Sequence, residues 1–275
     1  MKKNPFATLT IAGSDSIGGA GIQADIKTMS ALGCYATSCI TAITAQNTMG
    51  VKRVEAISSQ LLFSQIICVL EDMNILATKT GMIYTAENVF AIKHSLTQMN
   101  YKGKLIIDPV LIATSGDALA REDFIQTLVQ ELFSMADLVT PNLYEAETIS
   151  KVSIKNKEDM TKSAKKIQSL YGAKNVLIKG GHLQENEMTD VLLTSEGEIE
   201  LYSLPKLEAN NTHGTGCSLS SAICSFLALG QGMQEAIFNA KNYVHTAIKE
   251  AKGINLGHGH GSLNHFFAPQ KMKTI

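Results

Sequence analysis

The chain has 275 residues, enough for one large domain or two small ones, and its 45% hydrophobic and 18% charged content excludes intrinsic disorder. Its 24 basic and 25 acidic residues give a formal net charge of −1. This balance argues against sequence-independent nucleic-acid binding, whose affinity comes from neutralising phosphates.

The printed sequence shows neither a transmembrane nor a signal-peptide pattern. No apolar run approaches the ~20 residues of a transmembrane helix, and the basic start, Met1 to Phe6, leads into a short strand pattern instead of a signal-peptide core. The five cysteines are odd in number and lack CxxC spacing, so we expect neither a disulfide framework nor a zinc site. We therefore expect a cytoplasmic protein without a membrane partner.

Apolar runs rich in β-branched residues alternate with helix-length segments through most of the chain. This alternation predicts parallel strands joined by right-handed helical crossovers. The predicted strands cover residues 7–12, 36–45, 77–79, 104–107, 137–140 and 175–178, and the predicted helices about 20–32, 60–72, 85–99, 121–133, 143–150 and 157–171.

The pattern changes after the sixth predicted strand. Residues 191–194 and 199–202 flank a short polar loop, which predicts an antiparallel hairpin at one edge of the sheet. Two helices, about 215–229 and 233–251, follow the hairpin. Because no repeat, linker or proline-rich seam interrupts the chain, we predict one α/β domain over residues 1–275.

Glycines, amides and charged residues follow each predicted parallel strand. In open parallel sheets, ligands bind beyond the carboxyl ends of the strands, so these residues predict a common binding rim. In chain order they are Gly13 with Gly18 to Gly21, Gln46 with Asn47, Gly81 with Met82, Asp108 to Val110, Asn142 with Glu145, and Lys179 to His182.

The glycine-rich stretch Gly18 to Ala24 loosely matches the dinucleotide fingerprint. That fingerprint also needs an acidic residue about 20 positions later to hold a ribose. Residues 26–54 contain no Asp or Glu, and the sequence contains no GxxxxGK[ST] P-loop. We therefore interpret these glycines as a tight turn that lets the backbone approach a small ligand.

The segment Asn211-Thr212-His213-Gly214-Thr215-Gly216-Cys217 precedes a helix that starts with small residues. Gly-Thr-Gly lets successive N–H groups point into one concavity, and the helix adds its positive end. This arrangement predicts an anion site suited to a transferring phosphoryl group, with a plain glycine-rich helix cap as the alternative. At a helix N-terminus, Cys217 is expected to have a lowered thiol pKa.

These motifs resemble those of a known group. Gly-Thr-Gly-Cys before a terminal helix resembles the anion-hole motif of the ribokinase-like superfamily, in which most members have Asp at the position of Cys217. With this Cys, the chain is similar to the hydroxymethylpyrimidine/phosphomethylpyrimidine kinases of thiamine synthesis. The matching blocks include Thr10-Ile11-Ala12-Gly13-Ser14-Asp15, Lys79-Thr80-Gly81-Met82, Thr140-Pro141-Asn142-Leu143-Tyr144-Glu145-Ala146, Lys179-Gly180-Gly181-His182 and residues 211–217, in order across roughly 8–265.

The resemblance implies a fold and a reaction. The fold is a three-layer ribokinase-like sandwich, with a mostly parallel central sheet, helices on both faces and a small antiparallel edge hairpin. The reaction uses ATP and Mg²⁺ to phosphorylate the hydroxymethyl oxygen of 4-amino-5-hydroxymethyl-2-methylpyrimidine. A second ATP then converts the monophosphate to the diphosphate. The resemblance also suggests a homodimer.

The same resemblance assigns roles to individual residues. The pyrimidine pocket would be lined by Gly13, Asp25, Gln46, Met82, Val110 and Cys217. The nucleotide would be bound by Asp108, Asn142, Glu145, Lys179, Thr215 and Gly216, with Asp108 and Glu145 as magnesium ligands, directly or through water. Catalysis would depend on Lys179, Gly214, Thr215, Gly216 and Cys217. Gln46 carries an acceptor and donors on one amide, so it can pair with an aminopyrimidine edge, and Met82 offers a polarizable wall.

Several points stay open on sequence alone. Cys217 is expected to act as general base, but it could instead pack beside the hydroxymethyl group while the proton leaves late. A pyridoxal kinase, a ligand-binding protein that kept the fold, and a sugar kinase are the competing functions, and the last is weakened by the missing Asp at position 217. Near the end, Gly257 to Ser262 resembles the family's glycine-rich loop, expected near the nucleotide; metal binding by its two histidines is the alternative. Relatives often have Lys at the position of Thr114.

Overall fold

A computed structural model describes residues 3–111, 122–181 and 187–275, so Thr114 and His182 lie outside the described part of the chain. Its described strands form one sheet in the order β3-β2-β1-β4-β5-β6-β7-β8-β9. The strands are β1 (Ala7–Ser14), β2 (Tyr35–Asn47), β3 (Gly50–Ala56), β4 (Ile75–Thr80), β5 (Lys104–Ile107), β6 (Leu138–Val139), β7 (Val176–Ile178), β8 (Glu187–Leu193) and β9 (Ile199–Pro205).

The centre of the sheet is parallel. β1 pairs in parallel with β2 and with β4, and the parallel pairing continues from β4 through β5 and β6 to β7. β7, β8 and β9 are antiparallel to one another in turn, which confirms the predicted hairpin at one edge. The fold class predicted from the sequence is therefore confirmed.

The other edge of the sheet was not predicted. β3 runs antiparallel to β2 and forms a second edge hairpin. Its residues are partly or fully exposed, so the strand carries little of the apolar alternation that marks a buried strand. The sequence pattern therefore gave no element between residues 50 and 56.

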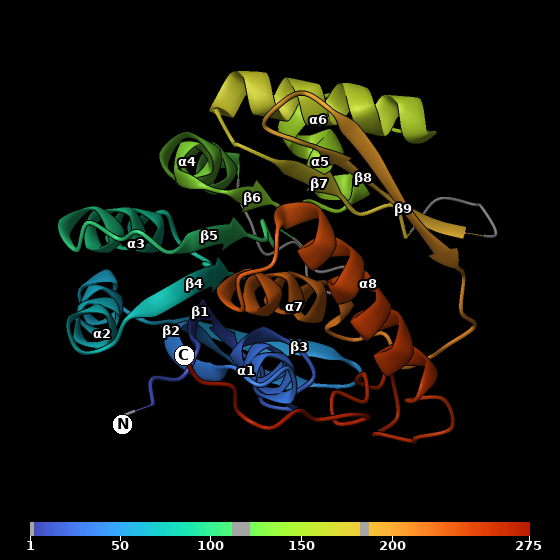
Figure 1. Ribbon diagram of the computed structural model, residues 1–275, viewed down its shortest axis with the longest axis horizontal. Helices are drawn as coiled ribbons and strands as arrows, with labels where there is room; N and C mark the ends of the chain where they lie inside the picture. The colour runs from blue at the N-terminus through green and yellow to red at the C-terminus, as the bar shows by residue number, and fades with distance from the viewer. Residues whose placement is uncertain (1–2, 112–121, 182–186) are drawn as a thin grey trace.

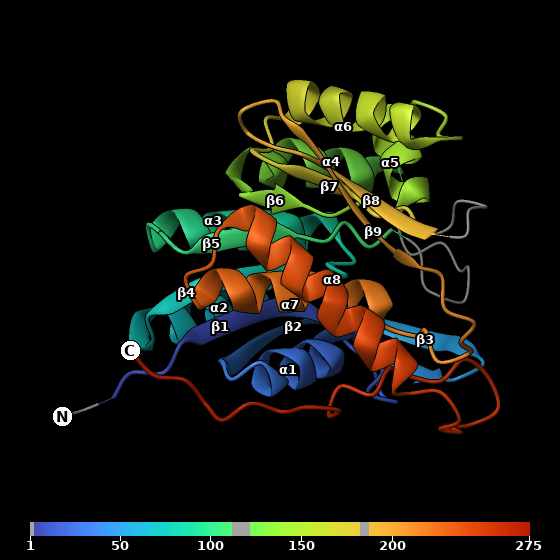
Figure 2. The same ribbon diagram turned by 45° about the vertical axis from the view of Figure 1, so that its right-hand side comes forward.

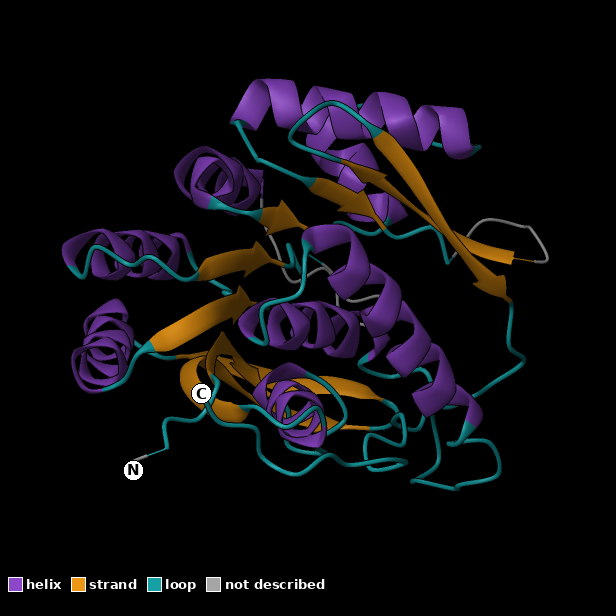
Figure 3. Cartoon of the chain, viewed as in Figure 1, coloured by secondary structure: helices purple, strands orange, loops and turns teal. Residues whose placement is uncertain are grey.

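Helices cover both faces of the sheet, as Figures 1 and 2 show. One buried apolar cluster lies under α2 to α6, and a second lies under α1, α7 and α8. Figure 3 separates the helical layers from the strands between them. The helices are α1 (Gly21–Ala31), α2 (Ser59–Asp72), α3 (Ala86–Gln98), α4 (Glu122–Leu132), α5 (Leu143–Ser150), α6 (Lys157–Tyr171), α7 (Thr215–Ala228) and α8 (Met233–Lys249), with a 3₁₀ turn at Phe133–Met135. None of the helices in the described ranges is both long and apolar enough to cross a membrane.

β1 is an interior strand of the sheet, between β2 and β4, and its composition reflects burial on both faces. Leu9 and Ile11 join the cluster under α2 to α6, while Thr8 and Thr10 alternate with them. The Thr10 hydroxyl donates to the carboxylate of Asp25 on α1 at 2.6 Å. The threonines thus satisfy polar groups beneath α1 while keeping the β-branched shape that strands favour.

The start of α7 differs from that of several other helices. Side-chain oxygens of Ser58, Thr85, Asn142 and Asn156 cap α2, α3, α5 and α6. The N-cap residue of α7 is Gly214, which makes no side-chain capping hydrogen bond. The first N–H groups of an α-helix have no carbonyl partner within the helix. In α7 the Thr215 N–H donates to the Thr212 carbonyl at 3.2 Å, so the N–H groups of Gly216 and Cys217 are the ones suited to an external acceptor.

Candidate active site

The first turn of α7 is held against the turn that follows β1. Gly214 has φ +84°, and a Cβ there would lie 1.8 Å from the Gly19 carbonyl oxygen. In the same way, a Cβ on Gly21 would lie 2.3 Å from the Gly13 carbonyl oxygen. Glycine is required at these positions because the two backbones approach too closely for any side chain. The predicted glycine-rich turn and the predicted anion site are therefore neighbours.

The same turn of α7 faces a carboxylate–ammonium pair. A Cβ on Gly216 would lie 3.4 Å from Lys179 Nζ and 3.8 Å from Asp108 Oδ2. Lys179 follows β7 and Asp108 follows β5, and their side chains meet at 2.7 Å. We call the first-turn backbone, Gly214 to Cys217, the anion cradle. It lies beside a partly open ammonium group, which is the charge that a phosphate needs.

Asp108 is almost completely buried and receives several donors. Besides Lys179, it accepts hydrogen bonds from Thr140 Oγ1 at 3.2 Å and from Ser220 Oγ at 3.2 Å. Burial alone would raise the pKa of Asp108, but the ammonium groups of Lys179 and Lys79 hold it below its usual value. Burial acts against the charge of Lys179 too, yet Asp108 and Glu145 raise its pKa. The pair is thus ionised at neutral pH.

Glu145 and Asn142 are joined in a capping box at the start of α5. Glu145 Oε2 accepts from the Asn142 N–H at 2.7 Å, and Asn142 Oδ1 accepts from the Glu145 N–H at 2.9 Å. Burial raises the pKa of Glu145 to about 7, with Lys179 opposing and Asp108 reinforcing that rise. Asn142 and Glu145, both predicted to face the nucleotide, thus lie at the start of α5, and their side-chain oxygens also cap that helix.

Four residues of the predicted ring pocket lie at or just beyond strand ends. Gln46, Met82 and Val110 are partly exposed, whereas Gly13 is buried. Gln46 is the next-to-last residue of β2. Its amide nitrogen lies 3.2 Å from Nε2 of His213, the residue just before the anion cradle. Met82 folds over Gly13, where a Cβ would lie 2.4 Å from Met82 Cε. The structure thus places Gln46 beside the residue that precedes the cradle, and Met82 against Gly13.

Asp25, also predicted to line that pocket, lies beneath it. Its side chain is fully buried, and both carboxylate oxygens lie 2.9 Å from Lys79 Nζ. Thr10 and Ser221 donate to the same carboxylate, each at 2.6 Å. Although burial disfavours the charge of Lys79, Asp25 raises its pKa above the usual value. Asp25 is thus fully occupied by protein donors.

The expectation that the Cys217 thiol has a lowered pKa is wrong. Burial raises its pKa to about 11, opposed by the Lys79 ammonium and reinforced by the carboxylates of Asp25 and Asp108. The Gly21 N–H bonded to the sulfur also lowers the pKa, but not enough. The positive end of a helix is a weaker influence here than the loss of water around the sulfur. At neutral pH the side chain is a thiol.

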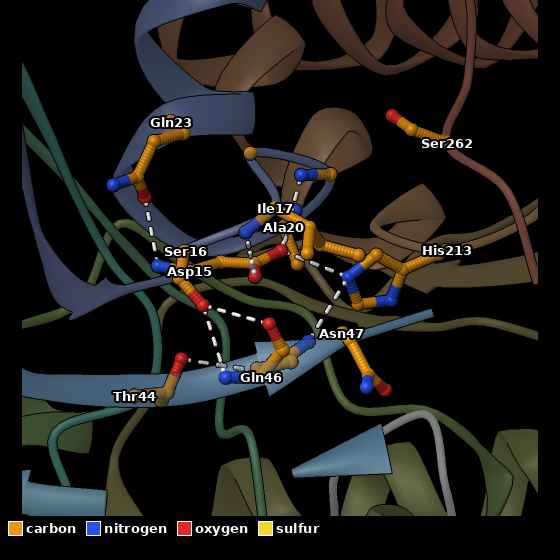
Figure 4. Close-up of polar contacts among 12 residues, drawn as sticks. Asp15, Ser16, Ile17, Ala20, Gln23, Thr44, Gln46, Asn47, His213 and Ser262 are labelled. Carbon is orange, nitrogen blue, oxygen red and sulfur yellow. Dashed lines mark hydrogen bonds and ion pairs between the residues drawn. The ribbon is translucent and has the colours of Figure 1, made fainter. Parts of the chain in front are cut away.

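Two residues of the site received no role from the sequence, Asp15 and His213. His213 Nε2 lies 2.9 Å from Asp15 Oδ2 and 3.2 Å from Gln46 Nε2, as Figure 4 shows. Both residues belong to blocks that carried the family resemblance, and that was their signal. Their mutual contact spans 198 positions of sequence, so no local pattern could have revealed it.

The glycine-rich tail lies against the β2–β3 turn. The N–H groups of His258 and Gly259 donate to Thr48 Oγ1 at 3.1 and 3.0 Å, and the N–H of His260 donates to the Thr48 carbonyl at 3.2 Å. Within the described ranges, no group of three or more His, Cys, Asp or Glu side chains could hold a metal ion alone. A cation at this site would therefore also need ligands from substrates or water.

Comparisons with known proteins agree with the geometry. The family model described as phosphomethylpyrimidine kinase matches residues 15–264. The hydroxymethylpyrimidine/phosphomethylpyrimidine kinase of Rhizobium meliloti (strain 1021) is 45% identical over 259 residues, covering 94% of this chain and 96% of its own length. The thiamine biosynthesis bifunctional protein of Geobacter sulfurreducens is 41% identical, and the match spans 99% of this chain but 55% of that protein.

Solved structures show the same fold. The crystal structure of phosphomethylpyrimidine kinase from Clostridium difficile 630 superposes with a TM-score of 0.78 at 43% identity, over 88% of this chain and 99% of that one. The pyridoxal kinase from Staphylococcus aureus in complex with AMP-PCP and pyridoxal superposes with a TM-score of 0.85 at 30% identity, over 98% and 96% of the two chains.

Proposed function

The chain belongs to the phosphomethylpyrimidine kinase family. From this premise we propose the phosphoryl transfer that it catalyses and the residues that carry it out. It transfers the γ-phosphoryl group of ATP to the hydroxymethyl oxygen of 4-amino-5-hydroxymethyl-2-methylpyrimidine. A second transfer converts the monophosphate to the diphosphate. The enzyme is thus a phosphotransferase of thiamine biosynthesis. The observation that supports this best is the position of the anion cradle, between the Asp108–Lys179 pair and Gln46.

Phosphoryl transfer depends mainly on positioning and on neutralising charge. The first-turn N–H groups of α7, at Gly216 and Cys217, are aimed where charge develops on the migrating group, as in other oxyanion sites. Lys179 Nζ, 3.4 Å from the Cβ position of Gly216, supplies a positive charge to the same group. We propose that Thr215 and Asn142 support the nucleotide side of this arrangement.

The acid residues near Lys179 fit a magnesium ion. Asp108 contributes to the raised pKa of Glu145, so the two carboxylates repel each other across the rim. A divalent cation relieves such repulsion, and Mg²⁺ commonly takes one or two carboxylates together with waters and substrate phosphates. We propose that Asp108 and Glu145 hold the ion, directly or through water. When bound, it neutralises phosphate charge.

The ring of the acceptor alcohol would lie against Met82, Gly13 and Val110, with Gln46 pairing to its polar edge. Asp25 lies beneath the pocket and pairs with Lys79. It does not bind the ring, because protein donors occupy both of its carboxylate oxygens. Each pocket residue comes from the end of a different parallel strand. The acceptor hydroxyl is thereby directed toward the cradle.

Cys217 is protonated at neutral pH, so we favour the late departure of the hydroxyl proton over a thiolate base. The thiol then packs beside the hydroxymethyl group. This proposal predicts that Cys217→Ser keeps kcat within roughly tenfold of the parent value. It also predicts that kcat/KM is level with pH once Glu145, whose pKa is raised to about 7, is fully ionised. The measurement is a pH–rate profile of both proteins. A parent rate that climbs roughly tenfold per pH unit toward 10 would require the thiolate and restore the base.

A second acceptor deserves testing because of one comparison. The Staphylococcus aureus pyridoxal kinase, solved with AMP-PCP and pyridoxal, matches nearly the whole chain. Pyridoxal is also a small aromatic ring with a hydroxymethyl group. We propose it as a weaker acceptor for this enzyme.

We further propose a cytoplasmic homodimer built from one domain. All five cysteines are free, which suits a reducing compartment. At the β2–β3 edge, Ile43 and Met49 are 51% and 69% exposed, a suitable apolar contact for a second copy. Sedimentation of the parent and of an Ile43→Lys variant tests this: a dimer that the variant converts to a monomer is expected, and a parent monomer would exclude it.

An ATP-dependent phosphorylation assay tests the function itself. The purified protein is given the aminopyrimidine alcohol, its monophosphate or pyridoxal, each with MgATP. We expect turnover of both pyrimidines and a lower kcat/KM for pyridoxal. Turnover of pyridoxal alone, or of no acceptor, would contradict the proposed function.

A further inference from the structure

Asp15, His213 and Gln46 meet beside the anion cradle and come from three distant parts of the chain. Asp15 follows β1, Gln46 lies at the end of β2, and His213 precedes α7. One imidazole nitrogen, Nε2 of His213, faces both partners, at 2.9 Å from Asp15 Oδ2 and 3.2 Å from the Gln46 amide. A nitrogen with one proton cannot serve as donor to one partner and acceptor to the other, so the contacts constrain each other.

The Asp15 carboxylate decides which role this nitrogen plays. Its Oδ2 accepts from the N–H groups of Gly19 at 3.0 Å and Ala20 at 2.8 Å, and its Oδ1 accepts from the N–H of Ile17 at 3.0 Å. Burial raises the pKa of Asp15, but the contact with His213 and the N–H groups of Ala20 and Ile17 hold it below its usual value. An ionised carboxylate only accepts, so Nε2 of His213 carries a proton.

The other neighbour of Gln46 leads to the same conclusion from the opposite side. Thr44 Oγ1 lies 3.3 Å from Gln46 Oε1, and it also lies 3.0 Å from the carbonyl oxygen of Ser14. A hydroxyl has one proton, and the shorter contact to Ser14 uses it. Thr44 therefore offers Gln46 a lone pair, and a lone pair needs an N–H group opposite.

Both neighbours are satisfied by one orientation of the amide. A half-turn about the last side-chain bond exchanges oxygen and nitrogen, which are nearly equal in size and are assigned from their partners. The oxygen then accepts from His213 Nε2, and the NH₂ group donates to Thr44 Oγ1. In the opposite orientation, two donors face each other at His213 and two oxygens compete for one proton at Thr44.

We propose that the Asp15–His213 pair fixes the Gln46 amide with its oxygen toward His213 and its NH₂ group toward Thr44, and so fixes the donor–acceptor order that Gln46 offers to the ring. Asp15 and His213 are positioning residues, since they act through Gln46. After these contacts the amide keeps one lone pair and one N–H for a ligand.

The inference rests on the proposed function for the identity of the ring. An aminopyrimidine edge carries an NH₂ donor beside a ring-nitrogen acceptor. The matching 4-oxo compound carries a carbonyl acceptor beside an N–H donor, which is the reverse order. A fixed amide is complementary to one order only and leaves unpaired groups against the other, which discriminates strongly. A freely turning amide would accept both.

The first test needs no variant and no turnover. Imidazole ¹⁵N–¹H NMR of the full-length protein reports which ring nitrogen of His213 is protonated. We expect a proton on Nε2. A neutral ring protonated on Nδ1 alone would overturn the proposal, whatever reaction the enzyme catalyses.

The second test measures selectivity. Parent and His213→Leu are assayed with the 4-amino alcohol and the 4-oxo alcohol, and the ratio of their kcat/KM values is compared. We expect the ratio to fall at least roughly tenfold in the variant, mainly through a higher KM for the amino compound. A ratio that is unchanged in an active variant would overturn the proposal.

Two further variants complete the design. Thr44→Val removes the partner of the NH₂ group without touching His213, and we expect a fall of the ratio in the same direction. If His213→Leu does not fold, Thr44→Val replaces it in the selectivity test. An unchanged kcat/KM ratio in active Thr44→Val also overturns the proposal. His245→Leu is the matched control, since this partly exposed histidine contacts the Pro205 carbonyl and should leave the ratio unchanged. If no variant or parent turns over pyrimidines, the proposed function fails, and the NMR result still decides the orientation.

Discussion

Two carboxylate–ammonium pairs lie under α7, and they differ in access to water. Asp25 and Lys79 are both 0% exposed, whereas Lys179 is 14% exposed and Asp108 1%. Consecutive serines of α7 donate to the two carboxylates, Ser221 to Asp25 at 2.6 Å and Ser220 to Asp108 at 3.2 Å.

The difference shows that the same pair of residue types, Asp with Lys, can have two roles in one protein. The sealed pair has protein donors on every side, so it ties α1, β4 and α7 together beneath the pocket. The second pair has the same groups but opens toward the anion cradle. A buried ion pair is held at high desolvation cost, which is tolerated where its partners are complete. Access to water therefore separates the structural pair from the pair that we propose to meet phosphate.

Breaking the sealed pair should give the largest effect on stability. Lys79→Met leaves the Asp25 charge buried with its hydroxyl donors alone, and we expect the free energy of unfolding to fall by about 3–5 kcal/mol. Urea denaturation measures it. The double variant Asp25→Leu with Lys79→Met should recover much of the loss, because no unpaired charge remains. A loss below about 1 kcal/mol in the single variant would mean that the pair is not structural.

Breaking the open pair should act mainly on the reaction. Lys179→Met removes the positive charge beside the cradle, so kcat should fall by roughly 10²–10³-fold. Stability should fall less than in Lys79→Met, because the positive charge of Lys79 still acts on Asp108 and water can reach the partly exposed position of Lys179.

The control for this prediction lies near the other end of the same strand. Lys174 pairs with Asp137 at 3.0 Å and its side chain is 57% exposed. Lys174→Met should leave kcat unchanged. If Lys179→Met kept the parent turnover and lost as much stability as Lys79→Met, the distinction between the two pairs would be wrong.

Glu145 offers the smallest and most local test, through the pH dependence of stability. Its pKa in the folded protein is raised to about 7, above the value of 4.5 for a free side chain. The folded state therefore binds an extra proton between these values, and the stability gained from it is lost as pH rises through about 7. Relative to Glu145→Gln, the Tm of the parent should fall by about 2–4 °C between pH 5 and pH 8.

Thermal unfolding without substrates measures this difference. Glu147→Gln, on the same helix, is the control and should run parallel to the parent. A parallel curve for Glu145→Gln would mean that Asp108 and Lys179 do not confine a proton at Glu145, and it would weaken the case for a cation between the two carboxylates.

The sequence predicted those features that depend on the succession of strands and helices along the chain. Alternating apolar runs predicted the parallel core, and the rule that ligands bind at carboxyl strand ends then placed Gln46, Asp108 and Lys179 along one rim. β3 was missed, because an exposed edge strand lacks the buried pattern on which the prediction relied. Only the structure shows that β3 pairs with β2.

Electrostatics and long-range contacts were the parts that sequence could not supply. The pKa of Cys217 was predicted in the wrong direction because its burial, together with Asp25 and Asp108, outweighs the helix end. Asp25 was expected at the ring, yet Lys79, 54 positions away, encloses it. The place of His213 in the site depends on its contact with Asp15, 198 positions earlier, which no local sequence pattern reveals.

The most direct measurement on the central claim is a crystal structure with MgADP, a metal fluoride that mimics the migrating phosphoryl group, and the aminopyrimidine alcohol. The account predicts fluorides within hydrogen-bond distance of the N–H groups of Gly216 and Cys217 and of Lys179 Nζ, with the alcohol in line. A mimic bound away from the first turn of α7, with those N–H groups facing water, would contradict it.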